Sequence, residues 1–170
     1  MTGLNPETSV ILEIAAVVTD GSLRTAAEGP DIAIHWPEKA LQNMERWSKT
    51  QHESSGLLER VRASSVDCQK AEREVLGFLS KNCKKGESPL CGNSIWQDRR
   101  LLIKYMPKLE AFFHYRNIDV SSIKELVKRW YPSVPTYKKK KVHLSLSDIN
   151  ESINELRYYR EKLFLPDALS

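Results

Sequence analysis

Three side chains of the kinds used in phosphodiester hydrolysis stand close to two expected helix starts. Asp98 follows the turn at Asn93-Ser94, while His143 and Asp148 flank the start of a C-terminal helix. A helix N-terminus carries partial positive charge and free N–H groups, so it favours a bound phosphate. Such a site is typical of two-ion hydrolysis, in which the carboxylates hold the ions and the imidazole takes a proton from the attacking water.

Each of these residues also has a simpler explanation when it is taken alone. Asp98 precedes Arg99-Arg100 and fits a surface charge, Asp148 fits a helix cap, and His143 fits a loop residue. Residue type and position therefore suggest a nuclease without deciding it.

The cysteines and the charge narrow the class of protein. Cys68, Cys83 and Cys91 form no C-x-x-C pair and are odd in number, which argues against a zinc site or a disulfide framework. Carboxylate ligands without cysteine favour Mg²⁺ or Mn²⁺. The net charge of +4 is compatible with an anionic ligand but not diagnostic. With no signal-peptide pattern and no apolar run of bilayer length, we expect a cytoplasmic protein that does not bind membranes.

The first part of the chain predicts two strands followed by helices. Residues 10–19 are β-branched and almost all apolar, as in a buried strand, and Asp20-Gly21 is a hairpin signal. Further elements follow: a second strand at 31–35, a short helix at 37–44, a polar loop at 47–56, a helix from about residue 57 and an amphipathic helix at 66–79.

The second part predicts the elements that carry the reactive residues. A strand near Pro89 turns into a helix over residues 95–106. Ser122 to Glu125 reads as a capping box for a helix that ends at Trp130. After a loop at 132–143, the C-terminal helix is expected to start at a cap of Ser145 or Ser147, with an inner face of Ile149, Ile153, Leu156 and Leu163.

Together these elements indicate a single α/β domain over residues 1–170, with a mixed sheet and flanking helices. A chain of this length is large enough for one core.

Several strings in the sequence closely resemble the bacterial oligoribonucleases, which are DEDD-type 3′-to-5′ exonucleases with a catalytic histidine. The most specific is GNSIWQDRR at 92–100, and the others are MTGLNP at 1–6, FHYR at 113–116 and YYRE at 158–161. The resemblance implies an RNase H-like fold, two divalent ions and a homodimer that degrades short RNA oligonucleotides, especially dinucleotides, to 5′-mononucleotides.

The resemblance also implies roles for individual residues. Asp98 and Asp148 match the third and fourth acidic ion ligands, and His143 matches the general base. Leu4 matches a residue wedged between two bases, and Trp47 and His52 match residues that line the 3′ nucleotide. Exposed bases of single-stranded RNA suit such apolar and aromatic contacts. Without the resemblance, core packing would explain Leu4 and Trp47 equally well.

Four more residues are assigned in the same way. Ser94, Arg116 and Ser121 match groups that close over a 5′ phosphate, and Tyr115 matches a catalytic tyrosine supplied across the dimer interface. An arginine fork suits a terminal phosphate, and closure of that end would restrict the substrate to short RNA.

The sequence departs from the family pattern at its start. The first two acidic ligands of the family come from a D-x-E motif on its first strand, directly before the Met of M-T-G, and here Met1 is the first residue. We interpret the first strand as truncated from the printed sequence. The alternative is an inactive dinucleotide-binding homodimer.

A second departure lies close to His143. The family's H-x-A-x-D-D appears as HLSLSD at 143–148, and lysines occupy 138–141 where the family has a mixed stretch. A homodimeric interaction protein that binds anionic partners through this lysine run is a third hypothesis, although such runs are usually solvated loops.

Overall fold

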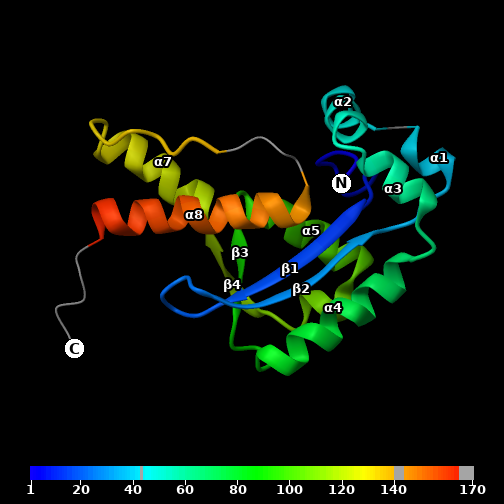
Figure 1. Cartoon of the computed structure of the whole chain (residues 1–170), viewed down its shortest axis with the longest axis horizontal. Helices are drawn as coiled ribbons and strands as arrows, with labels where there is room; N and C mark the ends of the chain where they lie inside the picture. The colour runs from blue at the N-terminus through cyan, green and yellow to red at the C-terminus, as the bar shows by residue number, and fades with distance from the viewer. Residues whose placement is uncertain (43, 140–143, 165–170) are drawn as a thin grey trace.

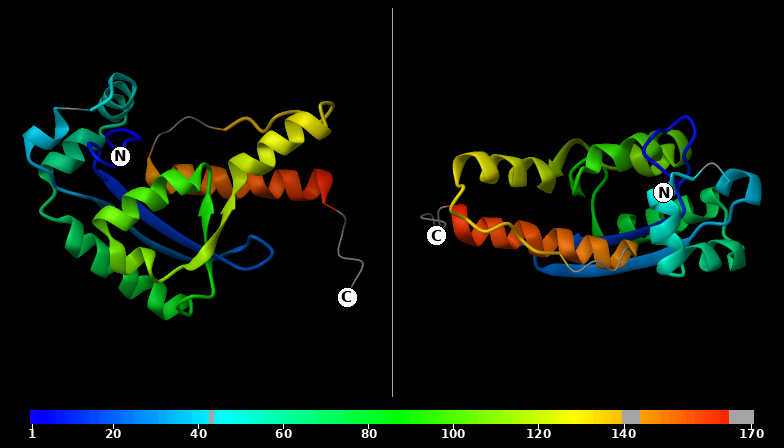
Figure 2. Two further views of the ribbon diagram at one scale, coloured as in Figure 1. Left: turned by 180° about the vertical axis from the view of Figure 1, so that it is seen from behind. Right: turned by 90° about the horizontal axis from the view of Figure 1, so that it is seen from above.

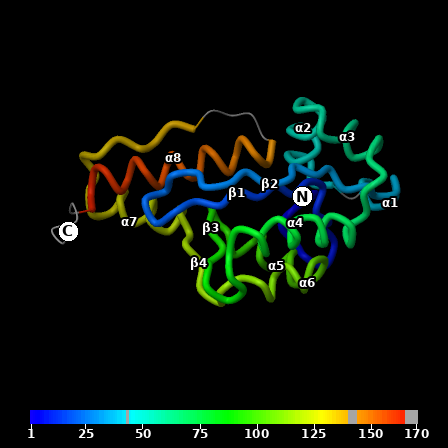
Figure 3. The backbone as a smooth tube through the Cα atoms, turned by 60° about the horizontal axis from the view of Figure 1, so that its bottom comes forward, coloured from blue at the N-terminus to red at the C-terminus, as the bar shows by residue number. Residues whose placement is uncertain are grey.

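The computed structural model of the protein describes residues 1–42, 44–139 and 144–164. It has the mixed α/β architecture that the sequence predicts, with small sheets and helices packed around them (Figures 1 and 2). Figure 3 shows α8 (Ser145–Leu163) on one side of the first pair of strands, and α4 (Cys68–Asn82) and α5 (Ile95–Tyr105) on the other. None of the described helices has the length and apolar character needed to cross a membrane.

The first sheet is a hairpin of β1 (Glu13–Thr19) and β2 (Thr25–Ala33). Its turn is held by Asp20, whose Oδ1 accepts the backbone N–H groups of Ser22 at 2.8 Å and Arg24 at 2.9 Å. The expected strand over residues 10–19 is confirmed from residue 13. The second strand starts earlier than the predicted residue 31, because its first half carries small and polar residues that pair along β1 without an apolar pattern.

The second sheet pairs β3 (Pro89–Gly92) with β4 (His114–Asp119) in parallel. The sequence predicts β3 but not β4. The reason is that β4 has the sequence HYRNID and is mostly exposed, so it lacks the apolar alternation by which a half-buried strand is recognised.

The two sheets are not hydrogen-bonded to each other within the described parts of the chain. There, β1 pairs only with β2, and β3 only with β4. Helix α8 contacts both β1 and β3 (Figure 1). Strands β1 and β3 therefore each have one edge that pairs with no other strand in the described parts of the chain.

Most helices form where the sequence predicts them. The helices α1 (Glu38–Leu41), α3 (Leu57–Ala63), α4 and α5 confirm the expected positions. The polar loop predicted at 47–56 is wrong, because this segment forms α2 (Arg46–Ser54). Only Ser48 is buried in α2, so no apolar stripe marks it, and the helix ends before Gly56, whose φ of +72° suits glycine.

Two apolar clusters form the core. One joins Ile11, just before β1, and Ile32 and Ile34, at the end of β2, to α4, α5 and the short α6 (Pro107–Glu110). The other packs Val10 and Leu12 against α1 and α3. The apolar run before β1 thus serves both clusters, which places the first strand at the centre of the fold.

Three details of the last helices differ from the prediction. The cap of α7 (Val120–Trp130) is Asp119, which accepts the N–H of Ser121 at 2.8 Å, so the capping box proposed at Ser122 is wrong. Neither Ser145 nor Ser147 caps α8, whose N-cap residue is Leu144. The buried residues of α8 are Glu151, Glu155 and Tyr159 instead of the predicted apolar set, which is only half-buried, because polar contacts fill that face.

Candidate active site

Asp98 lies in the first turn of α5, directly after a tightly held turn. Ser94, which begins the helix, has a φ of +49°, a left-handed conformation that is uncommon for residues other than glycine. Its backbone N–H donates to Asp119 Oδ1 at 3.0 Å and to Ser121 Oγ at 3.0 Å. These bonds from the start of α7 fix the turn and therefore the direction of α5.

The surroundings of Asp98 disfavour its charged form. Burial raises its pKa to about 6, an effect opposed by the ammonium group of Met1 and increased by Asp119. Burial in turn lowers the pKa of the Met1 ammonium, against the attraction of Asp98 and Glu13. A carboxylate in this environment is best stabilised by a bound cation.

We expect Asp98→Asn to stabilise the ion-free protein at high pH. Folding raises the pKa of Asp98 from 3.8 to about 6. The neutral carboxyl therefore makes its full contribution to the free energy of unfolding below pH 3.8, and this contribution is lost as the pH rises through 6. Asparagine stays neutral. At pH 8 in a chelator, its free energy of unfolding should exceed that of the unaltered chain by roughly 1–3 kcal/mol.

Urea unfolding of both proteins at pH 4 and pH 8 measures this difference. At pH 4 the two should be nearly equal. A difference that is the same at both pH values would show that the carboxyl charge is not its cause.

Glu13 connects β1 to the start of α8. Its Oε2 accepts the backbone N–H of Ser145 at 2.7 Å, although the two residues are far apart in the sequence. Arg60 pairs with the other oxygen of Glu13 and lies 3.6 Å from Asp31. The Glu13 carboxylate thus satisfies an N-terminal N–H of α8 that a serine cap was expected to satisfy.

This contact sets the position of Asp148, which is exposed in the first turn of α8. Since the Met1 ammonium is attracted by both Asp98 and Glu13, the starts of α5 and α8 border a common region around Met1. The other member of the predicted catalytic set, His143, lies outside the described residues.

The predicted base-binding residues gather around the first residues of the chain. His52 Nε2 lies 2.9 Å from the carbonyl oxygen of Met1. Glu45, at the start of α2, accepts the N–H of Leu4 at 3.2 Å. Leu4 and Trp47 are 53% and 66% exposed, so core packing does not explain either side chain.

The predicted phosphate-binding residues are brought together only in part. The hydroxyl groups of Ser94 and Ser121 lie 3.2 Å apart. Arg116 lies on exposed β4 with its guanidinium 5.3 Å from the ring centre of Tyr115, and no contact joins it to the serines. Tyr115 is 72% exposed and its ring packs beside that of His114.

Sequence reasoning missed three residues that hold these parts in place. Arg99 donates to the carbonyl oxygens of His114 and Tyr115 at 3.0 Å each, and so fixes β4 to α5. Asp119 holds the turn before Asp98, and Glu13 holds α8. A signal for Glu13 was available, because it is the one acidic residue in the apolar run over residues 10–19.

A divalent ion would find two candidate carboxylates here, Asp98 and Asp148. Within residues 1–42, 44–139 and 144–164, no group of three or more His, Cys, Asp or Glu side chains is arranged to hold a metal ion. The raised pKa of Asp98 fits a cation ligand, because a cation would favour the charged carboxylate. The described donor set therefore fits part of an ion site.

The sequence and the fold agree with those of known exonucleases. A family model described as RNase_T, Exonuclease, matches residues 1–156. The chain is 55% identical to an oligoribonuclease of Marinobacter nauticus over 96% of this chain and 92% of the relative. It is 58% identical to an oligoribonuclease of Pseudoalteromonas atlantica over 96% and 91%, and 55% identical to that of Pseudomonas aeruginosa over 95% and 90%. The chain therefore belongs to the oligoribonuclease family of RNase T-like exonucleases.

Proposed function

We propose that this chain is a 3′-to-5′ exoribonuclease that degrades RNAs of a few nucleotides, especially dinucleotides, to 5′-mononucleotides. The observation that carries the proposal is the half-buried Asp98 in the first turn of α5, one turn after Ser94, whose hydroxyl lies 3.2 Å from that of Ser121, in a chain more than half identical to oligoribonucleases. A carboxylate that favours a cation then lies near two hydroxyls that can bind a phosphate oxygen, as hydrolysis of a short 5′-phosphorylated substrate requires.

Asp98 and Asp148 would hold Mg²⁺ or Mn²⁺ together with two further carboxylates. When bound, such ions polarise the scissile phosphate and favour hydroxide at neutral pH. The chain's own groups then bind and orient the RNA, while His143 takes the proton of the attacking water. Oxygen ligands suit these hard ions.

The remaining carboxylates would come from a D-x-E motif on a further strand. Support comes from β1 and β3, each of which has one edge that is unpaired in the described parts of the chain, and both of which contact α8. One strand paired with both edges would join the two sheets and would satisfy their backbone groups. The result would be one RNase H-like sheet in a single domain.

The exposed apolar groups would bind the bases. Leu4 would lie between two bases, with Trp47 and His52 beside the 3′ nucleotide, since stacking on such side chains suits unpaired bases. Ser94, Ser121 and Arg116 would close over the 5′ phosphate. For this, Arg116 would move towards the two serines, or the partner subunit would add groups that complete the phosphate site. The free thiols of Cys68, Cys83 and Cys91 fit the cytoplasmic location that we propose.

The experiment that tests this function compares residues 1–170 with the same residues preceded by a strand that carries D-x-E. We expect little or no Mg²⁺-dependent hydrolysis of a 5′-phosphorylated dinucleotide by the first and clear hydrolysis by the second. The difference arises because two carboxylates cannot hold two ions well.

A matched control carries N-x-Q in place of D-x-E. It restores the strand but not the ligands, so it should be as stable as the D-x-E form and inactive. Robust Mg²⁺-dependent turnover by residues 1–170 would show that the start of the chain is wrongly aligned with the family pattern.

An inactive dinucleotide-binding protein is the second candidate. The observation that favours it is the lack of a cluster of three ion ligands in the described chain. Such a protein would bind the dinucleotide in both the D-x-E and the N-x-Q forms but would release no mononucleotide from either.

A further inference from the structure

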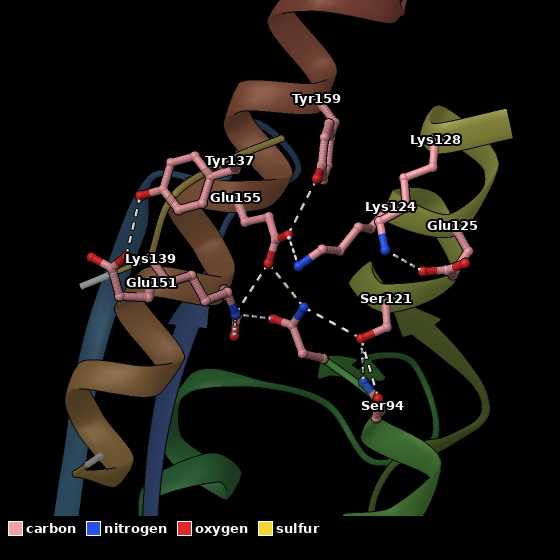
Figure 4. Close-up of polar contacts among 12 residues, drawn as sticks. Ser94, Ser121, Lys124, Glu125, Lys128, Tyr137, Lys139, Glu151, Glu155 and Tyr159 are labelled. Atoms are coloured by element: carbon pink, nitrogen blue, oxygen red, sulfur yellow. Dashed lines mark hydrogen bonds and ion pairs between the residues drawn. The ribbon is translucent and has the colours of Figure 1, made fainter. Parts of the chain in front are cut away.

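Glu155 is a charged residue that is completely buried in the middle of α8. Its carboxylate accepts from Asn93 Nδ2 at 2.9 Å and lies 3.1 Å from Lys139 Nζ and 3.3 Å from Lys124 Nζ (Figure 4). The hydroxyl of Tyr159 donates to it at 3.3 Å. Burial raises the pKa of Glu155, but hydrogen bonds from Asn93 and Lys139 and the charges of both lysines outweigh this and lower it.

Asn93 connects Glu155 to the turn before Asp98. Its Oδ1 accepts from Lys139 Nζ at 2.5 Å, while its Nδ2 also reaches Ser121 Oγ at 3.4 Å. The next residue, Ser94, has the left-handed conformation with a φ of +49°. A strained residue of this kind keeps its conformation only where several surrounding contacts impose it.

Lys139 belongs to the lysine run that the sequence suggests is a solvated loop. Its ammonium turns inward to Glu155 and Asn93 (Figure 4). The neighbouring Lys138, in contrast, is exposed. Lys139 is also four residues before His143 in the sequence. The buried Glu155 carboxylate therefore links the segment before the proposed general base, His143, to the turn that contains Ser94.

We propose that Glu155, Lys139 and Asn93 form a positioning network that holds Ser94 and Ser121 in the arrangement that binds the 5′ phosphate. The inference rests on the proposed function of the two serines and adds the residues that act through them. None of the three needs to touch the RNA. A purely structural role, in which the contacts only stabilise α8, is the competing explanation.

The first test measures the binding of two dinucleotides by calorimetry, one with and one without a 5′ phosphate. Lys139→Met should lower the preference for the phosphorylated form about tenfold, the usual effect of losing one charge-assisted hydrogen bond. Lys138→Met is the matched control, because it removes the same charge one residue away, and it should leave the preference unchanged. Glu155→Gln should act like Lys139→Met.

A structural role would weaken the binding of both dinucleotides equally and would leave the preference intact. That result, or equal effects of Lys139→Met and Lys138→Met, would overturn the inference. Thermal unfolding curves of all variants show whether each variant is folded at the temperature of the binding measurement.

The second test needs no substrate. Hydrogen exchange at the Ser94 N–H, which Asp119 and Ser121 hold, should be about tenfold faster in Lys139→Met than in Lys138→Met if the turn loosens. Unchanged exchange at Ser94 in a folded Lys139→Met chain would contradict the network. If the unaltered chain binds neither dinucleotide, the proposed function fails at this site, while the exchange rate still decides on the network.

Discussion

Replacing Asp98 by alanine in the form that carries the D-x-E strand should abolish hydrolysis of a 5′-phosphorylated dinucleotide, and so should Asp148→Ala. Each change removes an ion ligand. Because bound ions supply several kcal/mol of transition-state stabilisation, the loss of rate should be about 10³-fold or more. The rate of mononucleotide release at saturating Mg²⁺ measures it, and excess Mn²⁺ should not restore it fully.

Two further variants test whether this loss of rate is specific to the ion ligands. His143→Ala should leave ion binding intact and lower the rate ~10²–10⁴-fold, as expected for a general base. Asp67→Asn should have no effect, because Asp67 caps α4 through the N–H of Lys70 and asparagine caps equally well. If Asp98→Ala retains the rate of the Asp67→Asn control, Asp98 is not an ion ligand.

The segment around Asp98 is predictable from sequence for a local reason. The short strand, the Asn93-Ser94 turn and the helix that follows are adjacent in the chain, so turn signals and apolar spacing define all three. The contacts that fix this turn are different. They come from Asp119, Ser121 and Glu155, which are between 25 and 62 residues away in the sequence.

The elements that were missed have little apolar pattern. Both α2 and β4 are mostly exposed, and their stability depends on what they pack against or pair with. On α8 the apolar residues predicted the wrong inner face, since Glu151, Glu155 and Tyr159 recur at four-residue spacing and are buried by polar contacts. Burial of charged groups depends on partners from other elements, which periodicity does not reveal.

The last prediction concerns the proposed homodimer, in which each active site would use Tyr115 of the other subunit. Tyr115 is 72% exposed, yet its backbone is held by Arg99 and its ring lies beside His114 and Arg116. A large aromatic side chain that is exposed and held in place in this way is typical of a residue buried by a partner. If the sites are shared, a dimer of two different mutants can contain one complete site.

Tyr115→Ala and Asp98→Ala should therefore each be inactive alone and should recover activity when mixed in the form that carries the D-x-E strand. In a mixed dimer, the chain with intact Asp98 receives intact Tyr115 from its partner, while the second site lacks both. Free exchange in an equal mixture should restore about a quarter of the active sites, given a symmetric dimer.

Subunit exchange is verified by native mass spectrometry on chains of different mass, and mononucleotide release is compared with both parents. A mixture that exchanges but stays as inactive as its parents would show that Tyr115 acts within its own subunit. Recovery in a mixture of Asp98→Ala with Asp148→Ala would contradict the scheme in the other direction, because both ligands belong to one subunit and neither site of that mixed dimer can be complete.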